Sequence, residues 1–112
     1  MFEAQESFVK KLVSEVNGAW ESIKADYERF TWKDEPMEVY RVESFVGTSA
    51  VRLHPSIEAL DLLRNLQIAM KKEETWTSCS VSINSSGKYN FDFSYGMPPM
   101  IEKTLKLRGE IQ

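Results

Sequence analysis

The sequence predicts an α+β domain in which an antiparallel sheet carries two main helices on one face. Two observations predict it: apolar residues recur at helical spacing near the N-terminus and again after Ser56, and residues 76–95 alternate apolar and polar positions. The expected order is helix, strand, strand, a short optional strand, helix, strand, strand. With 112 residues, the chain is expected to form a single domain, residues 1–112, around one core.

A stripe of apolar residues places the first helix between about Glu3 and Asn17. The stripe follows steps of three and four and comprises Phe8, Leu12, Val13 and Val16. Gly18 then supplies a stop, because glycine adopts the left-handed conformation that ends helices.

Residues 19–32 fit two structures. Trp20, Ile23, Tyr27 and Phe30 continue the helical spacing, so this stretch is able to extend the first helix. Ile23, Ala25 and Tyr27 also alternate as in a strand. Periodicity leaves both alternatives open.

Residues 33–36 are expected to form a turn, because Pro36 disfavours helix at the residue before it. A β-branched and aromatic run from Met37 to Val46 predicts a strand that Gly47 ends. Residues 49–53 are a candidate short strand before His54 and Pro55.

The second helix is expected to begin after Ser56, a typical N-cap residue. Its apolar face comprises Ile57, Leu60, Leu63, Leu66 and Met70. Lys71 and Lys72 are expected near its end, where positive charge suits the negative pole of the helix dipole.

Residues 76–95 predict a β-hairpin. Cys79, Val81 and Ile83 alternate with serines, and after a turn Tyr89, Phe91, Phe93 and Tyr95 alternate with polar residues. Residues 84–87 form the turn, with Gly87 able to take a positive φ. The aromatic residues are expected to face the core. The tail residues Ile101, Leu105 and Leu107 are expected to form a short closing segment.

This hairpin resembles the signature of the YezG-like immunity proteins. That family carries a Trp-Thr/Ser opening, alternating apolar positions, a Gly-Lys turn and an aromatic-x-apolar-Asp-Phe-x-Tyr close. The matching positions are Trp76, Gly87, Lys88, Tyr89, Phe91, Asp92, Phe93 and Tyr95. The resemblance is close over residues 76–95, and the order of elements agrees over nearly the whole chain. It favours a strand from Glu21 to Thr31. The C-terminal segment departs from the family pattern because it is short and has no Trp.

The resemblance implies an immunity protein that neutralises a cognate secreted bacterial toxin, often a nuclease, by stoichiometric, non-catalytic binding. A secretion chaperone or adaptor for another bacterial protein is the alternative, since small size and acidic charge fit both. An enzyme is not expected, because the sequence offers no nucleophile and base pair, phosphate loop or metal cluster. No cofactor is expected.

Charge and composition exclude several partner classes. The formal net charge of −3 argues against direct nucleic-acid binding. No apolar run reaches the length of about 20 residues that a membrane-spanning helix needs, and the N-terminal residues do not resemble a signal peptide, so a cytoplasmic location is expected. Cys79 is the only cysteine, which excludes an internal disulfide. Oligomeric state is left open.

Two sets of residues are candidates for partner binding. Between Glu21 and Glu43 seven acidic residues outnumber four basic ones, and such a stretch is able to steer a basic partner. Its candidate residues are Asp26, Glu28, Asp34, Glu35, Glu38 and Glu43. The second set lies on the outward face of the hairpin and comprises Ser80, Ser82, Asn90 and Asp92. The alternative for both sets is a solvated surface.

The remaining candidates for chemistry are expected to be structural. His54 is the only histidine and precedes a proline in a loop, and Cys79 shares its face with Val81, so a buried thiol is expected. Adjacent Glu73 and Glu74 diverge at a helix end and do not form an acid and base pair.

Overall fold

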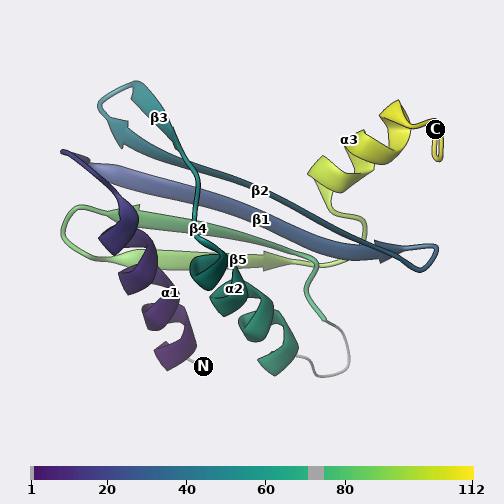
Figure 1. The fold of residues 1–112 in the computed structure, drawn as a ribbon, viewed down its shortest axis with the longest axis horizontal. Helices are drawn as coiled ribbons and strands as arrows, with labels where there is room; N and C mark the ends of the chain where they lie inside the picture. Colours follow the sequence, from purple (N-terminus) through teal and green to yellow (C-terminus); the bar gives the residue numbers. More distant parts are fainter. Residues whose placement is uncertain (1, 71–74) are drawn as a thin grey trace.

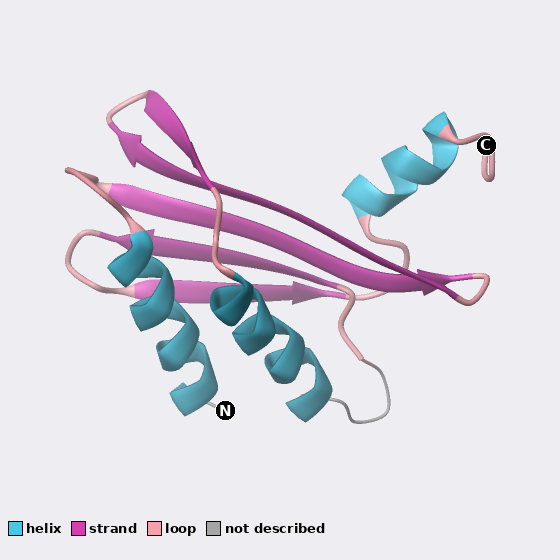
Figure 2. Ribbon diagram, in the orientation of Figure 1, coloured by secondary structure: helices cyan, strands magenta, loops and turns pink. Residues whose placement is uncertain are grey.

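The computed structural model describes residues 2–70 and 75–112. These residues form, in order, α1 (Phe2–Glu15), β1 (Ser22–Trp32), β2 (Glu35–Val46), β3 (Ser49–Leu53), α2 (Ile57–Ala69), β4 (Ser78–Asn84), β5 (Tyr89–Ser94) and α3 (Pro99–Leu107). The strands form one sheet in the order β3-β2-β1-β4-β5, and each neighbouring pair is antiparallel (Figure 2). The predicted α+β class and order of elements are confirmed, and α3 is added at the C-terminal end.

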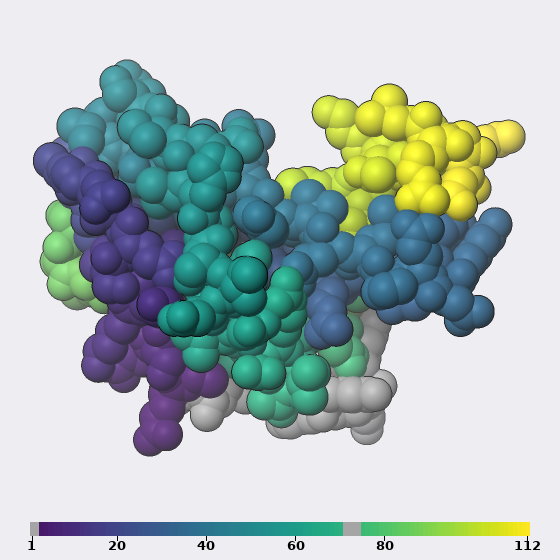
Figure 3. Space-filling view, viewed as in Figure 1, coloured from purple at the N-terminus to yellow at the C-terminus, as the bar shows by residue number. Residues whose placement is uncertain are grey.

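The two faces of the sheet differ. α1 and α2 lie side by side on one face, called here the helix face (Figure 1). The opposite face, called the outer face, carries the even-numbered residues of β1, β4 and β5, whereas Ile23, Ala25 and Tyr27 point to the helix face and are buried. α3 packs against β1 and β2 beside the tip of their hairpin, seen in yellow and blue in Figure 3. No helix in residues 2–70 or 75–112 combines the length and apolarity needed to cross a membrane.

The core fills the space between the two helices and the sheet. Phe8 of α1 meets Phe91 of β5 edge to face, with ring centroids 6.2 Å apart. Trp76, which is 1% exposed, lies against Tyr27 and Phe93. The other fully buried side chains of this cluster include Leu12, Ile23, Leu63, Leu66, Val81 and Ile83. The apolar stripes predicted for both helices therefore meet the apolar positions of the strands.

Residues 22–32 form the central strand of the sheet, as the family resemblance favoured. β1 pairs with β2 on one side and β4 on the other. Ile23, Ala25 and Tyr27 are each 1% exposed, because the period of two places all three against the helices. Residues 19–32 therefore do not extend the first helix.

The turn after β1 is shorter than predicted. It contains only Lys33 and Asp34, whose φ angles are 48° and 67°, and β2 already begins at Glu35. Pro36 thus lies inside a strand, opposite Thr31. β3 pairs with β2 only from Val42 onward, so the edge of β2 beside Pro36 has no neighbouring strand. Proline is tolerated at such an edge because its missing N–H removes no ladder hydrogen bond.

α2 begins where it is predicted to begin, but the first residue of its predicted apolar face is exposed. The Ser56 hydroxyl accepts a hydrogen bond from the Ala59 N–H at 3.1 Å, which confirms the N-cap. Leu60 is buried as expected. Ile57 is 74% exposed, so its predicted place on the apolar face is wrong, because the first residue of the helix precedes the contact with the sheet. Lys71, Lys72 and the pair at 73–74 lie outside the described residues.

The predicted hairpin of β4 and β5 is confirmed, with one correction. Gly87 has a φ of 88°, and the Asn84 side chain accepts a hydrogen bond from the Lys88 N–H at 3.0 Å. Phe91 and Phe93 pack against the core. Tyr95 is 53% exposed and does not face the core, because β5 ends at Ser94 and the chain turns toward α3.

The predicted closing segment is α3. Ile101 and Leu105, one helical turn apart, are both fully buried, as expected. Leu107 is 81% exposed, so its predicted contact is wrong, because it lies off the helical stripe that faces the sheet. Pro99 at the first helical position has the φ that a helix start requires.

Candidate functional site

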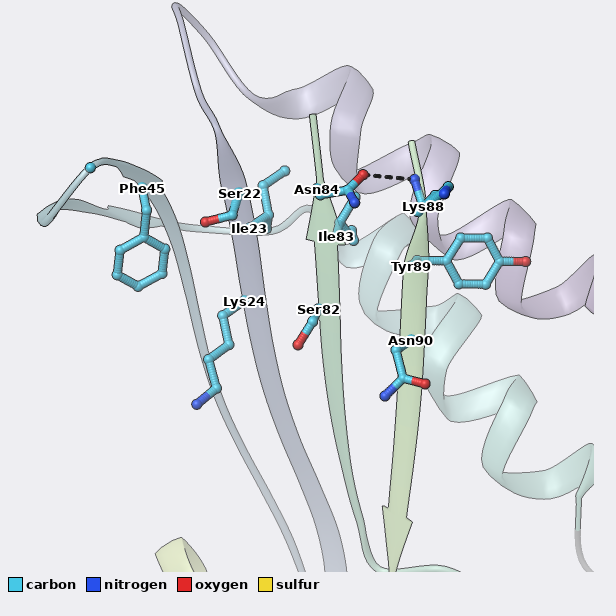
Figure 4. Close-up of a pocket in the computed structure, with 11 residues that line it drawn as sticks. Ser22, Ile23, Lys24, Phe45, Ser82, Ile83, Asn84, Lys88, Tyr89 and Asn90 are labelled. Carbon is cyan, nitrogen blue, oxygen red and sulfur yellow. Dashed lines mark hydrogen bonds between the residues drawn. The ribbon is translucent and has the colours of Figure 1, made fainter. Parts of the chain in front are cut away.

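The outer face carries rows of small polar residues. The register places Asp26, Ser80 and Asp92 side by side on β1, β4 and β5. The neighbouring row contains Lys24, Ser82 and Asn90, whose side chains project to the same side of the sheet in Figure 4. That row continues to Glu43 on β2, so the structure brings six sequence-predicted candidates onto one face: Asp26, Glu43, Ser80, Ser82, Asn90 and Asp92.

Two carboxylates on this face are held by neutral donors. The Ser80 hydroxyl donates to Asp26 Oδ1 at 2.8 Å, and the Asn90 amide donates to Asp92 Oδ2 at 3.1 Å. Arg41, the nearest neighbour of Asp26 on β2, directs its Nε to Glu43 at 3.2 Å. Within the described ranges neither Asp26 nor Asp92 belongs to an ion pair. Lys24, Arg41 and Arg52 lie on the same face, so the two carboxylates add a negative potential that is local to their own part of it.

Two hollows lie along the outer face. The first, called here the α3 hollow, has a volume of about 410 Å³, and its lining includes Asp26, Arg41, Ser80 and Asp92 of the strands together with Pro99 and Met100 of α3. The second, called the hairpin hollow, has a volume of about 590 Å³ and is shown in Figure 4. Its lining includes Lys24, Phe45, Ser82, Asn84 and Asn90. Small side chains on the strands leave room for a partner to approach the sheet closely.

Glu28 sets the position of α3. Its side chain lies on the outer face of β1 but is only 2% exposed. One carboxylate oxygen accepts from the Met100 N–H at 2.9 Å and the other from the Ile101 N–H at 2.8 Å. Pro98, the N-cap residue of α3, makes no side-chain capping bond. Glu28 therefore replaces the missing cap and places a negative charge at the positive end of the helix dipole.

The six acidic candidates between Asp26 and Glu43 do not form one surface. Glu38 points to the helix face, where it binds Arg64 of α2 and accepts a hydrogen bond from the Tyr27 hydroxyl. Glu35 forms a bidentate ion pair with Arg108, at 2.9 and 3.0 Å. Only Asp26 and Glu43 lie on the open outer face, and Asp34 is exposed at the hairpin tip. The predicted acidic stretch is thus divided among the helix face, the ion pair with Arg108, the open outer face, the hairpin tip and, for Glu28, the buried start of α3.

The titration of several groups reflects these contacts. The hydrogen bond from Arg64 lowers the pKa of Glu38, whereas burial and the Glu38 carboxylate raise the pKa of Tyr27. Burial, together with the charges of Asp26 and Asp92, raises the pKa of the Cys79 thiol to about 12. Cys79 is therefore a buried, protonated thiol.

The remaining sequence candidates stay apart from this site. His54 is exposed in the loop between β3 and α2. Among the residues that the structure describes, no group of three or more His, Cys, Asp or Glu side chains is arranged to hold a metal ion.

Pro99, Met100 and the burial of Glu28 were not predicted from the sequence. Glu28 is a candidate for partner binding in the sequence, with a solvated surface as the alternative, and both interpretations place it at the surface. The structure differs, because α3 covers Glu28 and leaves it 2% exposed. The available signal was the proline pair at 98–99 followed by apolar residues at 101 and 105, which is typical of a helix start.

Comparison with protein-family models and with curated protein sequences finds no match to this chain.

Proposed function

We propose that this protein is an immunity protein that binds a cognate bacterial toxin, in particular a nuclease toxin, and neutralises it by stoichiometric, non-catalytic binding. The observation that carries the proposal is the open outer face, with its small polar side chains and the two carboxylates of Asp26 and Asp92 outside any ion pair of the described residues. α1 and α2 cover the opposite face of the sheet, whereas α3 covers only part of the outer face.

The outer face also carries Lys24, Arg41 and Arg52, so the charge that supports a basic partner is the local charge of Asp26 and Asp92. Nuclease domains present basic surfaces to their substrates, and carboxylates facing such a surface increase the association rate and the specificity of a complex. The Trp76 to Tyr95 resemblance supports the same conclusion, because the hairpin that matches the immunity-protein signature supplies two of the five strands of this face.

The resemblance to immunity proteins implies that the toxin gene lies beside the gene for this protein, so the direct experiment co-expresses the protein with the candidate toxin encoded immediately upstream. Growth is expected to recover, and the two proteins are expected to co-elute as a stoichiometric complex. A complex in which the toxin remains active would contradict inhibition and favour a chaperone or adaptor.

A charge-reversal pair tests the surface itself. The double variant Asp26→Lys/Asp92→Lys is expected to lose protection, because like charges then face the basic partner. The matched control Glu3→Lys/Glu6→Lys makes the same change in net charge on an exposed part of α1 and is expected to protect fully. Equal protection by both double variants would exclude the outer face.

A further inference from the structure

We infer that the α3 hollow receives one long basic side chain of the bound partner, a lysine or an arginine. Its charged head binds Asp26 and Asp92, and its aliphatic stem packs on Pro99 and Met100. This inference rests on the proposed function and adds the chemistry of the central contact.

The strand side of the hollow provides the acceptors. Asp26 and Asp92 are bonded to a hydroxyl and an amide and leave further lone pairs free for N–H donors. Ser78 and Ser94 line the same hollow and add hydroxyl oxygens. Arg41 also lines it, but its Nε is directed to Glu43 at 3.2 Å. Hydrogen bonds between a cationic donor and a carboxylate are roughly twice as strong as neutral ones. A lysine or arginine head is therefore the group that uses these acceptors best.

The helix side provides an apolar wall. Met100 is partly buried and Pro99 is exposed, and both line the hollow opposite the carboxylates. Lysine and arginine bury their aliphatic stems along apolar surface while the charged head stays at a polar site. A polar face alone would accept any cation, whereas carboxylates beside an apolar wall favour a cation on an aliphatic stem.

Glu28 fixes the distance between the two sides. Its hydrogen bonds to the Met100 and Ile101 N–H groups attach the first turn of α3 to β1, the strand that carries Asp26. Glu28 is thus a positioning residue for Met100 and makes no contact of its own with the partner.

The volume agrees with this occupant. At about 410 Å³ the hollow lies near the lower end of the range of about 300–1,000 Å³ typical of ligand sites. One extended side chain with its bound water fits such a space.

The test uses butylguanidinium, a cation with an aliphatic stem, and tetramethylammonium, a cation without N–H donors. At low salt, butylguanidinium is expected to shift the amide NMR signals of Ser80, Asp92 and Met100, and tetramethylammonium is expected to leave them in place. Shifts spread over exposed carboxylates elsewhere, or equal shifts with both cations, would overturn the inference.

Variants identify the groups involved. Asp26→Asn/Asp92→Asn is expected to weaken butylguanidinium binding by about tenfold or more, because two charge-assisted hydrogen bonds become neutral. The matched control Glu3→Gln/Glu6→Gln is expected to bind as the wild type does. Met100→Ala is expected to weaken butylguanidinium more than guanidinium itself, which has no stem. Unchanged binding in the Asp26 and Asp92 variant would also overturn the inference.

The outcomes separate this inference from the proposed function. If the upstream toxin binds wild type and Asp26→Asn/Asp92→Asn equally well, the hollow is not the contact, although inhibition stands. If butylguanidinium binds the hollow but no toxin complex forms, the immunity function fails and the cation site remains.

Discussion

Glu28 of β1 and Ile101 of α3 are joined by a hydrogen bond of 2.8 Å across 73 residues of sequence. With the second bond to Met100, this contact fixes the C-terminal helix on a sheet face that would otherwise be open along its whole length. The shape of the α3 hollow therefore depends on one buried carboxylate.

Glu28→Ala is expected to lower the free energy of unfolding by about 2–4 kcal/mol, because two N–H groups at the helix start lose their acceptor and α3 loses its cap. Urea denaturation measures the change. Glu3→Ala, at an exposed position of α1, is the control and is expected to be near neutral. A loss below about 0.5 kcal/mol in Glu28→Ala would show that α3 does not depend on this contact.

Leu105→Ala is expected to destabilise the protein by about 2–5 kcal/mol, because it leaves a cavity beneath α3. Leu105 is fully buried, whereas Leu107 on the same helix is 81% exposed. Leu107→Ala, which removes the same atoms, is therefore expected to change stability by less than about 0.5 kcal/mol. Equal effects of the two substitutions in urea titrations would contradict the packing of α3.

The contact between Glu38 and Arg64 is expected to make stability pH-dependent. Arg64 lowers the pKa of Glu38 in the folded state, so folding gains stability above the ordinary glutamate value of 4.5 and loses it as the pH falls through the lowered pKa. Glu38→Gln is expected to be less stable than wild type at neutral pH, and the difference is expected to shrink in acid. Urea denaturation midpoints of both proteins, at neutral and at acid pH, measure this stability difference. A difference that grew in acid would contradict the stabilising contact between Glu38 and Arg64.

Asp34→Gly is expected to stabilise the β1–β2 hairpin by roughly 0.5–1 kcal/mol. Lys33 and Asp34 both have positive φ, as in the two-residue turns that prefer glycine at the second position. Thermal unfolding measures the gain. Thr31→Gly, inside β1, serves as the contrasting variant and is expected to destabilise, because glycine weakens a strand interior.

Local patterns in the sequence predicted the parts of the fold that depend on neighbouring residues. The alternation of Cys79, Val81 and Ile83 identified β4, because a period of two matches a strand and does not match the period of a helix. The choice between helix and strand for residues 22–32 required the family resemblance, because Ile23 and Tyr27 satisfy both periods.

Contacts between distant segments were not predictable from local patterns. Glu28 lies in an acidic stretch and is expected on the surface until α3 is placed over it. Pro36 indicates a turn when only the sequence is considered. It fits inside a strand because the edge of β2 beside it has no neighbouring strand. For the candidate site, the alternation of β4 and β5 placed Ser80 and Asp92 on one face, but the contribution of Met100 depends on how α3 docks.

Hydroxyl-radical footprinting of the complex with the upstream toxin tests the central claim, that the outer face is the binding surface, most directly. Binding is expected to protect Met100 and Phe45, which line the two hollows, and to leave Ile57 and Ile68 of α2 reactive. Protection of Ile57 and Ile68 with unchanged reactivity at Met100 and Phe45 would place the toxin on the other side of the molecule and contradict the claim.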